Sequence, residues 1–218
     1  MSNFLFRGTL FLFMLSASLC EAQNIKKFNL ATLLNDNKPV FSPKQDITIV
    51  KDGAYNGVSL KGIAWLKGVT FSTGSIDIDL RGRDVVQQSF LGIAFHGIDT
   101  TTYDAVYFRP FNFQSTDTLR GKHMVEYISE PDYPWYRLRK EHPLEYENGI
   151  TTPPLAAAWF HAHIVVGENE IRVYVNRSRI PSLIVKKLNT RNDGLIGLWT
   201  DSLALNGDFA NLEISANK

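Results

Sequence analysis

The chain has 218 residues, a formal net charge of +1 and an aromatic content of 12%. It carries no long basic or acidic tract, which argues against nucleic acid and anionic membrane surfaces as partners. Its single cysteine is Cys20, so the rest of the chain offers no disulfide, no thiolate metal site and no cysteine nucleophile.

The first 22 residues have the pattern of a secretory signal. Arg7 precedes an apolar block, and small residues then lead to a predicted cleavage after Ala22. The block is too short for a membrane span, so we expect no transmembrane segment and a secreted or periplasmic protein. Cys20 would be the acylated residue of a lipoprotein, but Leu19 stands where such signals carry a small residue, so no lipid anchor is expected.

Residues 23–218 read as one all-β domain. Short segments alternate apolar with polar residues, and Gly, Pro, Asn and Asp separate them, without a sustained helical period. Roughly a dozen such segments are typical of an antiparallel sandwich of two sheets.

Three of these segments lie between residues 74 and 113. Strand side chains alternate between faces, so one set should point inward: Ile76, Ile78, Leu80, Leu91, Ile93, Phe95, Val106 and Phe108. The other set should point outward: Asp77, Asp79, Arg81, Gly92, Ala94, His96, Tyr107 and Arg109. The inward set predicts a core, and the outward set predicts a candidate site.

The stripe Tyr107, Arg109 and Phe111 is interrupted by Pro110, which predicts a strand near an edge or a bulge. Alternating rings and a guanidinium offer a pyranose both a stacking face and hydrogen-bond donors. The alternative is that the stripe packs beneath another part of the chain.

The next strand predicts a carboxylate on the same face. If Val125 and Tyr127 fill the core, Glu126 joins the candidate site and could act in acid/base catalysis. An ordinary exposed glutamate is the alternative.

Residues 131–154 break the strand pattern. The segment holds five of the nine prolines and several aromatic residues, and an irregular insertion of this length is usually functional. Trp135 would serve as a sugar platform at the rim, or it would anchor the insertion to the sandwich.

Near the C-terminus, the segment WFHAHIVVGENEIRVYVN is followed by GLIGLW and DFANLEI. This order resembles the second half of a concanavalin A-like jelly roll, and most closely the secreted 3-keto-disaccharide hydrolase domains, which are laminin-G-like. The resemblance implies a two-sheet antiparallel jelly roll in which one sheet curves into a groove that generally holds saccharide. The segments GSIDIDLRG and YDAVYFRPF would be the first concave-sheet strands of that fold.

The laminarinase-type relatives carry a Glu-x-Asp-x-x-Glu run on one strand. The nearest run here begins with Asp77 and lacks the closing glutamate. Because a retaining glycosidase needs two carboxyl groups about 5 Å apart, we do not expect endoglucanase activity of that type.

Arg81 and Arg109, with Asp79 beside them, would grip sugar hydroxyls or a carboxylate from adjacent concave strands. The alternative is a solvated face whose charges pair with one another. His96 would move protons near neutral pH, or it would be a structural histidine.

No cofactor or metal is expected. His161 and His163 share one side of a strand, but Glu168 falls in a turn, so the set only partly imitates a metal motif. Calcium is common in jelly rolls of this superfamily, but Asp193 and Asp208 fall in predicted turns and give no ligand spacing.

We therefore expect a secreted carbohydrate-binding or accessory module that holds a glycan on its concave sheet. One alternative is a hydrolase resembling the 3-keto-disaccharide hydrolases, in which His96 or Glu126 moves protons. Another is a protein-interaction domain whose groove is filled by a partner.

Overall fold

The structure is a computed structural model that describes residues 24–35, 47–201 and 203–216. The predicted signal segment and Cys20 lie outside these residues. Among the described residues, neither α-helix has the length and apolar character needed to cross a bilayer.

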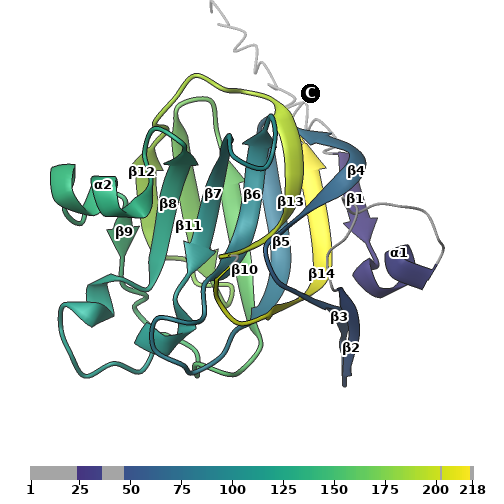
Figure 1. Cartoon of the computed structure of the whole chain (residues 1–218), viewed down its shortest axis with the longest axis horizontal. Helices are drawn as coiled ribbons and strands as arrows, with labels where there is room; N and C mark the ends of the chain where they lie inside the picture. Colours follow the sequence, from purple (N-terminus) through teal and green to yellow (C-terminus); the bar gives the residue numbers. More distant parts are fainter. Residues whose placement is uncertain (1–23, 36–46, 202, 217–218) are drawn as a thin grey trace, which may run out of the picture.

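The described chain forms two antiparallel sheets, so the predicted all-β sandwich is confirmed (Figure 1). One sheet has eight strands in the order β12-β11-β10-β5-β14-β3-β2, and β1 pairs with β14. Its strands are β1 (Asn24–Phe28), β2 (Thr48–Asp52), β3 (Tyr55–Leu60), β5 (Gly74–Arg81), β10 (Phe160–Val166), β11 (Glu170–Val175), β12 (Leu183–Lys186) and β14 (Gly207–Ala216).

The other sheet has six strands in the order β4-β13-β6-β7-β8-β9. Its strands are β4 (Ile63–Phe71), β6 (Leu91–Gly97), β7 (Tyr103–Phe108), β8 (Val125–Glu130), β9 (Glu147–Asn148) and β13 (Gly194–Thr200). The helices are α1 (Leu30–Asn35), α2 (Trp135–Glu141) and the 3-10 turns η1 (Pro110–Asn112) and η2 (Arg120–Lys122). Figure 1 shows α2 beside β8 at one side of the molecule and α1 at the opposite side.

The core lies between the two sheets and is built by alternation. Ile76, Ile78 and Leu80 of β5 are fully buried, as their spacing predicts. Phe108 of the six-stranded sheet meets Phe160 of the eight-stranded sheet edge to face, with ring centroids 5.1 Å apart. Such apolar contacts between facing sheets are the main stabilising interaction of a sandwich.

His96 does not obey the alternation. Its φ of 50° is left-handed, which turns the side chain inward, because the outward expectation assumes extended backbone at every residue. The fully buried imidazole lies 3.1 Å from a carboxylate oxygen of Asp104 and 2.7 Å from the carbonyl oxygen of Ser72. The prediction that His96 faces outward is therefore wrong.

The strand that carries Tyr107 is central and not at an edge, because β7 pairs with both β6 and β8. The backbone N–H of Arg109 still donates to the carbonyl of Met124, at 2.8 Å. Pro110 then ends the strand and begins η1. Pro110 is therefore tolerated because the hydrogen bonding of β7 to its neighbours has ended before it. The expectation that this strand lies near an edge is wrong.

The irregular insertion folds into α2 and β9. Leu138 and Tyr146 are buried and join the hydrophobic core, so these two side chains anchor the segment. Trp135 remains 46% exposed and is not a buried anchor.

Candidate functional site

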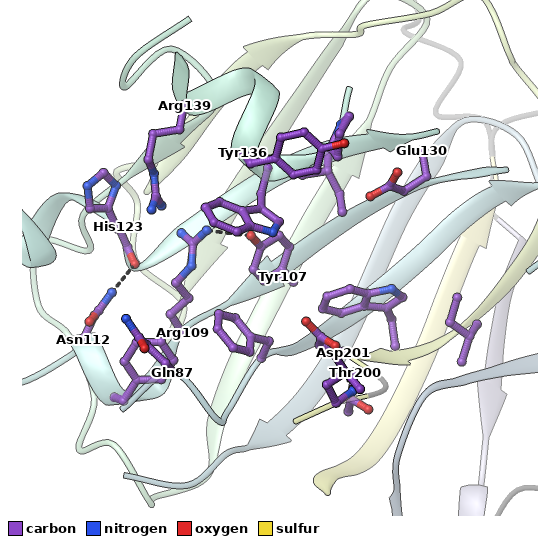
Figure 2. Close-up of a pocket in the computed structure, with 18 of the residues that line it drawn as sticks. Gln87, Tyr107, Arg109, Asn112, His123, Glu130, Tyr136, Arg139, Thr200 and Asp201 are labelled. Carbon is purple, nitrogen blue, oxygen red and sulfur yellow. Dashed lines mark hydrogen bonds between the residues drawn. The ribbon is translucent and has the colours of Figure 1, made fainter. Parts of the chain in front are cut away.

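A cavity of about 1180 Å³ opens on the outward face of the six-stranded sheet (Figure 2). Its floor comes from β7, β8 and β13, whose opposite face packs in the core. Helix α2 forms one wall, and the connections after β5 and after β13 form the other. The cavity therefore uses the face that alternation leaves free of the core.

Aromatic rings line much of the cavity. Tyr107 lies against Trp199 with ring centroids 4.9 Å apart, and Phe90 meets Phe111 edge to face at 5.3 Å. The indole N–H of Trp199 donates to the hydroxyl of Tyr103, at 3.2 Å. The rings are packed against one another, so they present preformed apolar surface to a ligand.

A buried hydrogen-bonded cluster lies at one end of the cavity. The hydroxyl of Tyr107 donates to Glu126 at 2.6 Å and accepts from the guanidinium of Arg109, also at 2.6 Å. Arg109 also binds Glu126 directly and donates to Glu147 at 3.2 Å. One guanidinium thus bridges two carboxylates and a phenol, which fixes its orientation.

The insertion and the connection that precedes β8 supply the rest of the cluster. Arg139 of α2 donates to Glu147 at 2.8 Å and 3.1 Å, and Nδ1 of His123 lies 2.6 Å from the same carboxylate. Glu147 and Arg139 were not singled out from the sequence. Both lie in the aperiodic insertion, where no spacing indicates which side chains face a common point.

The two carboxylates differ in their electrostatics. Burial raises the pKa of Glu126, and the charge of Arg109 offsets this only in part. Burial also acts to raise the pKa of Glu147, but the hydrogen bonds from Arg139 and the charge of Arg109 outweigh it and lower the pKa. Burial lowers the pKa of His123 although the charge of Glu147 opposes this, which favours the neutral imidazole.

The opposite end of the cavity is acidic. Glu130 and Asp201 both line it, and Figure 2 shows them on the side away from Arg109 and His123. Burial raises the pKa of Glu130. Neither carboxylate forms an ion pair with another described residue.

No protein-family model and no curated protein matches the chain. Several solved structures do match it. The carbohydrate binding module CBM66 from Bacillus subtilis is 12% identical with a TM-score of 0.53, over 82% of this chain and 98% of its own. The fold is a concanavalin A-like jelly roll.

Two further structures share this jelly roll. A Bacillus subtilis protein described as having a galectin-like fold is 9% identical with a TM-score of 0.58, over 87% of this chain and 94% of its own. The exoplasmic/lumenal domain of VIP36, in a form bound to Ca²⁺ and Man3GlcNAc, is 8% identical with a TM-score of 0.50. That match covers 90% of this chain and 91% of the VIP36 domain. At these identities the likeness concerns the fold alone.

The jelly roll brings four of the expected ligand-binding residues together. Tyr107, Arg109, Phe111 and Trp135 all line the cavity. Glu126 is on the expected face, since Val125 and Tyr127 are in the core, but it lies behind the cavity lining and is only 1% exposed.

The other expected residues lie elsewhere in the jelly roll. Arg81 is on β5 of the eight-stranded sheet, where it donates to Asp208 at 2.8 Å and to Asp52 at 2.6 Å. The expectation that Arg81 and Arg109 lie on adjacent strands is wrong, because they belong to opposite sheets. Asp79 lies on the same outward face as Arg81, and His96 is in the interior.

Asp79 belongs to a second polar cluster. His161 of β10 contacts Asp79 at 2.9 Å and Asp77 at 3.1 Å, and His163 contacts Asp77 at 2.8 Å. Register explains this, since His161 pairs opposite Asp79 and His163 opposite Asp77. Among the described residues, no group of His, Cys, Asp and Glu has an arrangement suited to a metal ion.

The predicted turn position of Asp208 is also corrected. It lies in β14 and is buried, and Arg81 and Arg83 bind its two carboxylate oxygens. Such a carboxylate is already neutralised by arginine. Asp193 is exposed and directly precedes β13.

Proposed function

We propose that this protein is a secreted carbohydrate-binding module that holds a glycan in the cavity on the six-stranded sheet. The observation that carries the proposal is the combination of packed rings, Tyr107, Trp199 and Phe111, with the fixed guanidinium of Arg109 in one cavity. A sugar ring needs an apolar surface for its C–H face and oriented polar groups for its hydroxyls. The jelly-roll neighbours include a carbohydrate binding module and a domain bound to Man3GlcNAc, which supports this assignment. Secretion is inferred from the signal pattern of the first 22 residues.

The arrangement of Glu126 and Glu147 favours binding over hydrolysis. Glycoside cleavage by the common mechanisms needs two carboxyl groups that flank the scissile bond. Glu126 and Glu147 instead share one guanidinium, and both are buried. Their role is to position Arg109 and Tyr107.

A glycoside hydrolase is the second candidate. Glu130 favours it, because a cavity-lining carboxyl with a raised pKa is suited to proton donation. Release of reducing ends from any bound glycan, lost in Glu130→Gln, would establish this candidate in place of a binding module.

The test is retention on a glycan array of a protein comprising residues 23–218. Trp135→Ala removes an aromatic ring from the cavity, and Trp159→Ala is its matched control. Trp159 lies outside the cavity lining and stacks on Tyr55, with ring centroids 4.5 Å apart. We expect the first variant to lose retention and the second to keep it. Equal retention by both variants, or no retention by the unmodified protein, would refute the proposal.

A further inference from the structure

The charges along the cavity are separated by sign. Arg109, Arg120 and Arg139 line the cavity, as do Glu130 and Asp201. Arg120 lies beside Asn112, to which it donates at 3.2 Å. Figure 2 shows Arg109 and Arg139 on one side, with Glu130 and Asp201 on the opposite side. A ligand that fits this cavity must complement both ends. The net charge at each end therefore indicates which charged groups the ligand has.

At the arginine end, two of the three positive charges are neutralised within the protein. Arg109 binds Glu126 and Glu147, and Arg139 binds Glu147. Two guanidiniums therefore face two buried carboxylates. Burial lowers the pKa of the neighbouring His123, which disfavours a further positive charge there.

Arg120 is the positive charge that remains. Its guanidinium donates to the side-chain oxygen of Asn112 and to the carbonyl of Phe111, both at 3.2 Å, and these acceptors are uncharged. Among the described residues, no carboxylate forms an ion pair with Arg120. The two hydrogen bonds hold the guanidinium in place at the cavity, and no described carboxylate forms a side-chain ion pair with it.

The loop that carries Arg120 is itself ordered by local hydrogen bonds. The carboxylate of Asp117 accepts the backbone N–H groups of Leu119 and Arg120, at 2.8 Å and 3.0 Å. Asp117 therefore stabilises the turn that leads into η2. A side chain that is positioned before binding loses less conformational entropy when a ligand arrives.

We propose that the ligand is an acidic saccharide, whose carboxylate or sulfate group binds Arg120. This inference rests on the proposed glycan binding in the same cavity. The planar guanidinium suits either anion through paired N–H donors. At the other end, Glu130 and Asp201 accept hydrogens from hydroxyl groups of a neutral sugar residue. The ligand is thus anionic at one end and neutral at the other, since a second anion would be repelled there.

The experiment compares neutral oligosaccharides with counterparts that carry one terminal uronate or one sulfate, on one array at fixed ionic strength. We expect the acidic members to bind about tenfold more tightly than their neutral partners, as a charge-assisted contact implies. Arg120→Gln should abolish this preference for the acidic members. The matched control is Arg137→Gln, since Arg137 is exposed on α2, pairs with Glu141 and does not line the cavity.

A second variant tests the acidic end. Glu130→Gln with Asp201→Asn removes both charges there, so oligogalacturonate, which is anionic throughout, should bind the double variant better than the unmodified protein. Equal binding of neutral and acidic partners, or an acidic preference unchanged by Arg120→Gln, would overturn the inference and leave glycan binding itself intact. Retention of no saccharide by the unmodified protein would overturn the proposed function as well.

Discussion

Tyr107 donates its hydroxyl hydrogen to Glu126 from a directly opposed position on the neighbouring strand, at 2.6 Å. This contact joins β7 to β8 beneath the cavity and places the phenol oxygen where Arg109 also reaches it. A buried hydrogen bond to a carboxylate is stronger than one between neutral groups. The same contact therefore contributes to stability and orients the groups that face a ligand.

Tyr107→Phe should lower the free energy of unfolding by about 1.5–3 kcal/mol, because it deletes a buried hydrogen bond to a charged group and keeps the ring. Urea denaturation at pH 7 measures the change. Tyr136→Phe is the control, since Tyr136 lies on α2 and is mostly exposed, and it should leave the midpoint unchanged. Equal midpoints for the two variants would show that the hydrogen bond to Glu126 does not stabilise the fold.

Arg109→Met should be more damaging, by about 3–5 kcal/mol, because it leaves the buried carboxylates Glu126 and Glu147 without their shared guanidinium. Adding Glu126→Gln to Arg109→Met should restore part of the loss, since it removes one of the stranded charges. Denaturant unfolding of the single and double variants gives the coupling between the two positions. A double variant less stable than Arg109→Met would contradict this account.

The second polar cluster, which contains His161, should make the stability of the protein depend on pH. Hydrogen bonds to Asp77 and Asp79 raise the pKa of His161 to about 9. The folded pKa lies above the ordinary value of 6.5, so the stabilisation is complete below about pH 6.5 and is lost as the pH rises through 9. The imidazole resonances of His161 should titrate near pH 9. Thermal unfolding between pH 6 and 10 should show the protein losing stability as His161 loses its proton. The His161→Gln variant should lack this loss.

Gly92 in β6 has no room for a side chain. A Cβ at this position would lie 2.0 Å from the backbone carbonyl oxygen of Val106 on β7. Gly92→Ala should therefore force the two strands apart and cost about 1–3 kcal/mol or more. Gly121→Ala is the control, because a Cβ added at Gly121 would meet nothing within 4 Å. Thermal unfolding separates the two variants, and an unchanged melting temperature for Gly92→Ala would contradict the prediction.

Alternation along the sequence was enough to find the core and part of the cavity. Ile76 and Leu80 are buried, and Tyr107 and Arg109 share one face, because each depends only on local periodicity. The face of Glu126 followed from the same reasoning. These are the properties that a single strand determines without reference to its neighbours.

The errors arose where position depends on other parts of the chain. Arg81 and Arg109 have the same parity but belong to different sheets, and periodicity does not give strand pairing. His96 is turned inward by one left-handed residue within a strand. Glu147 acquires its role only because the insertion returns to pair with β8.

The insertion that forms one wall of the cavity also completes the charge balance beneath it, because Glu147 comes from β9 and neutralises Arg109. A loop grafted in place of residues 131–154 would therefore need to bring its own carboxylate to the same point. Without that carboxylate, the replacement segment would destabilise the domain before any change in ligand specificity could be measured.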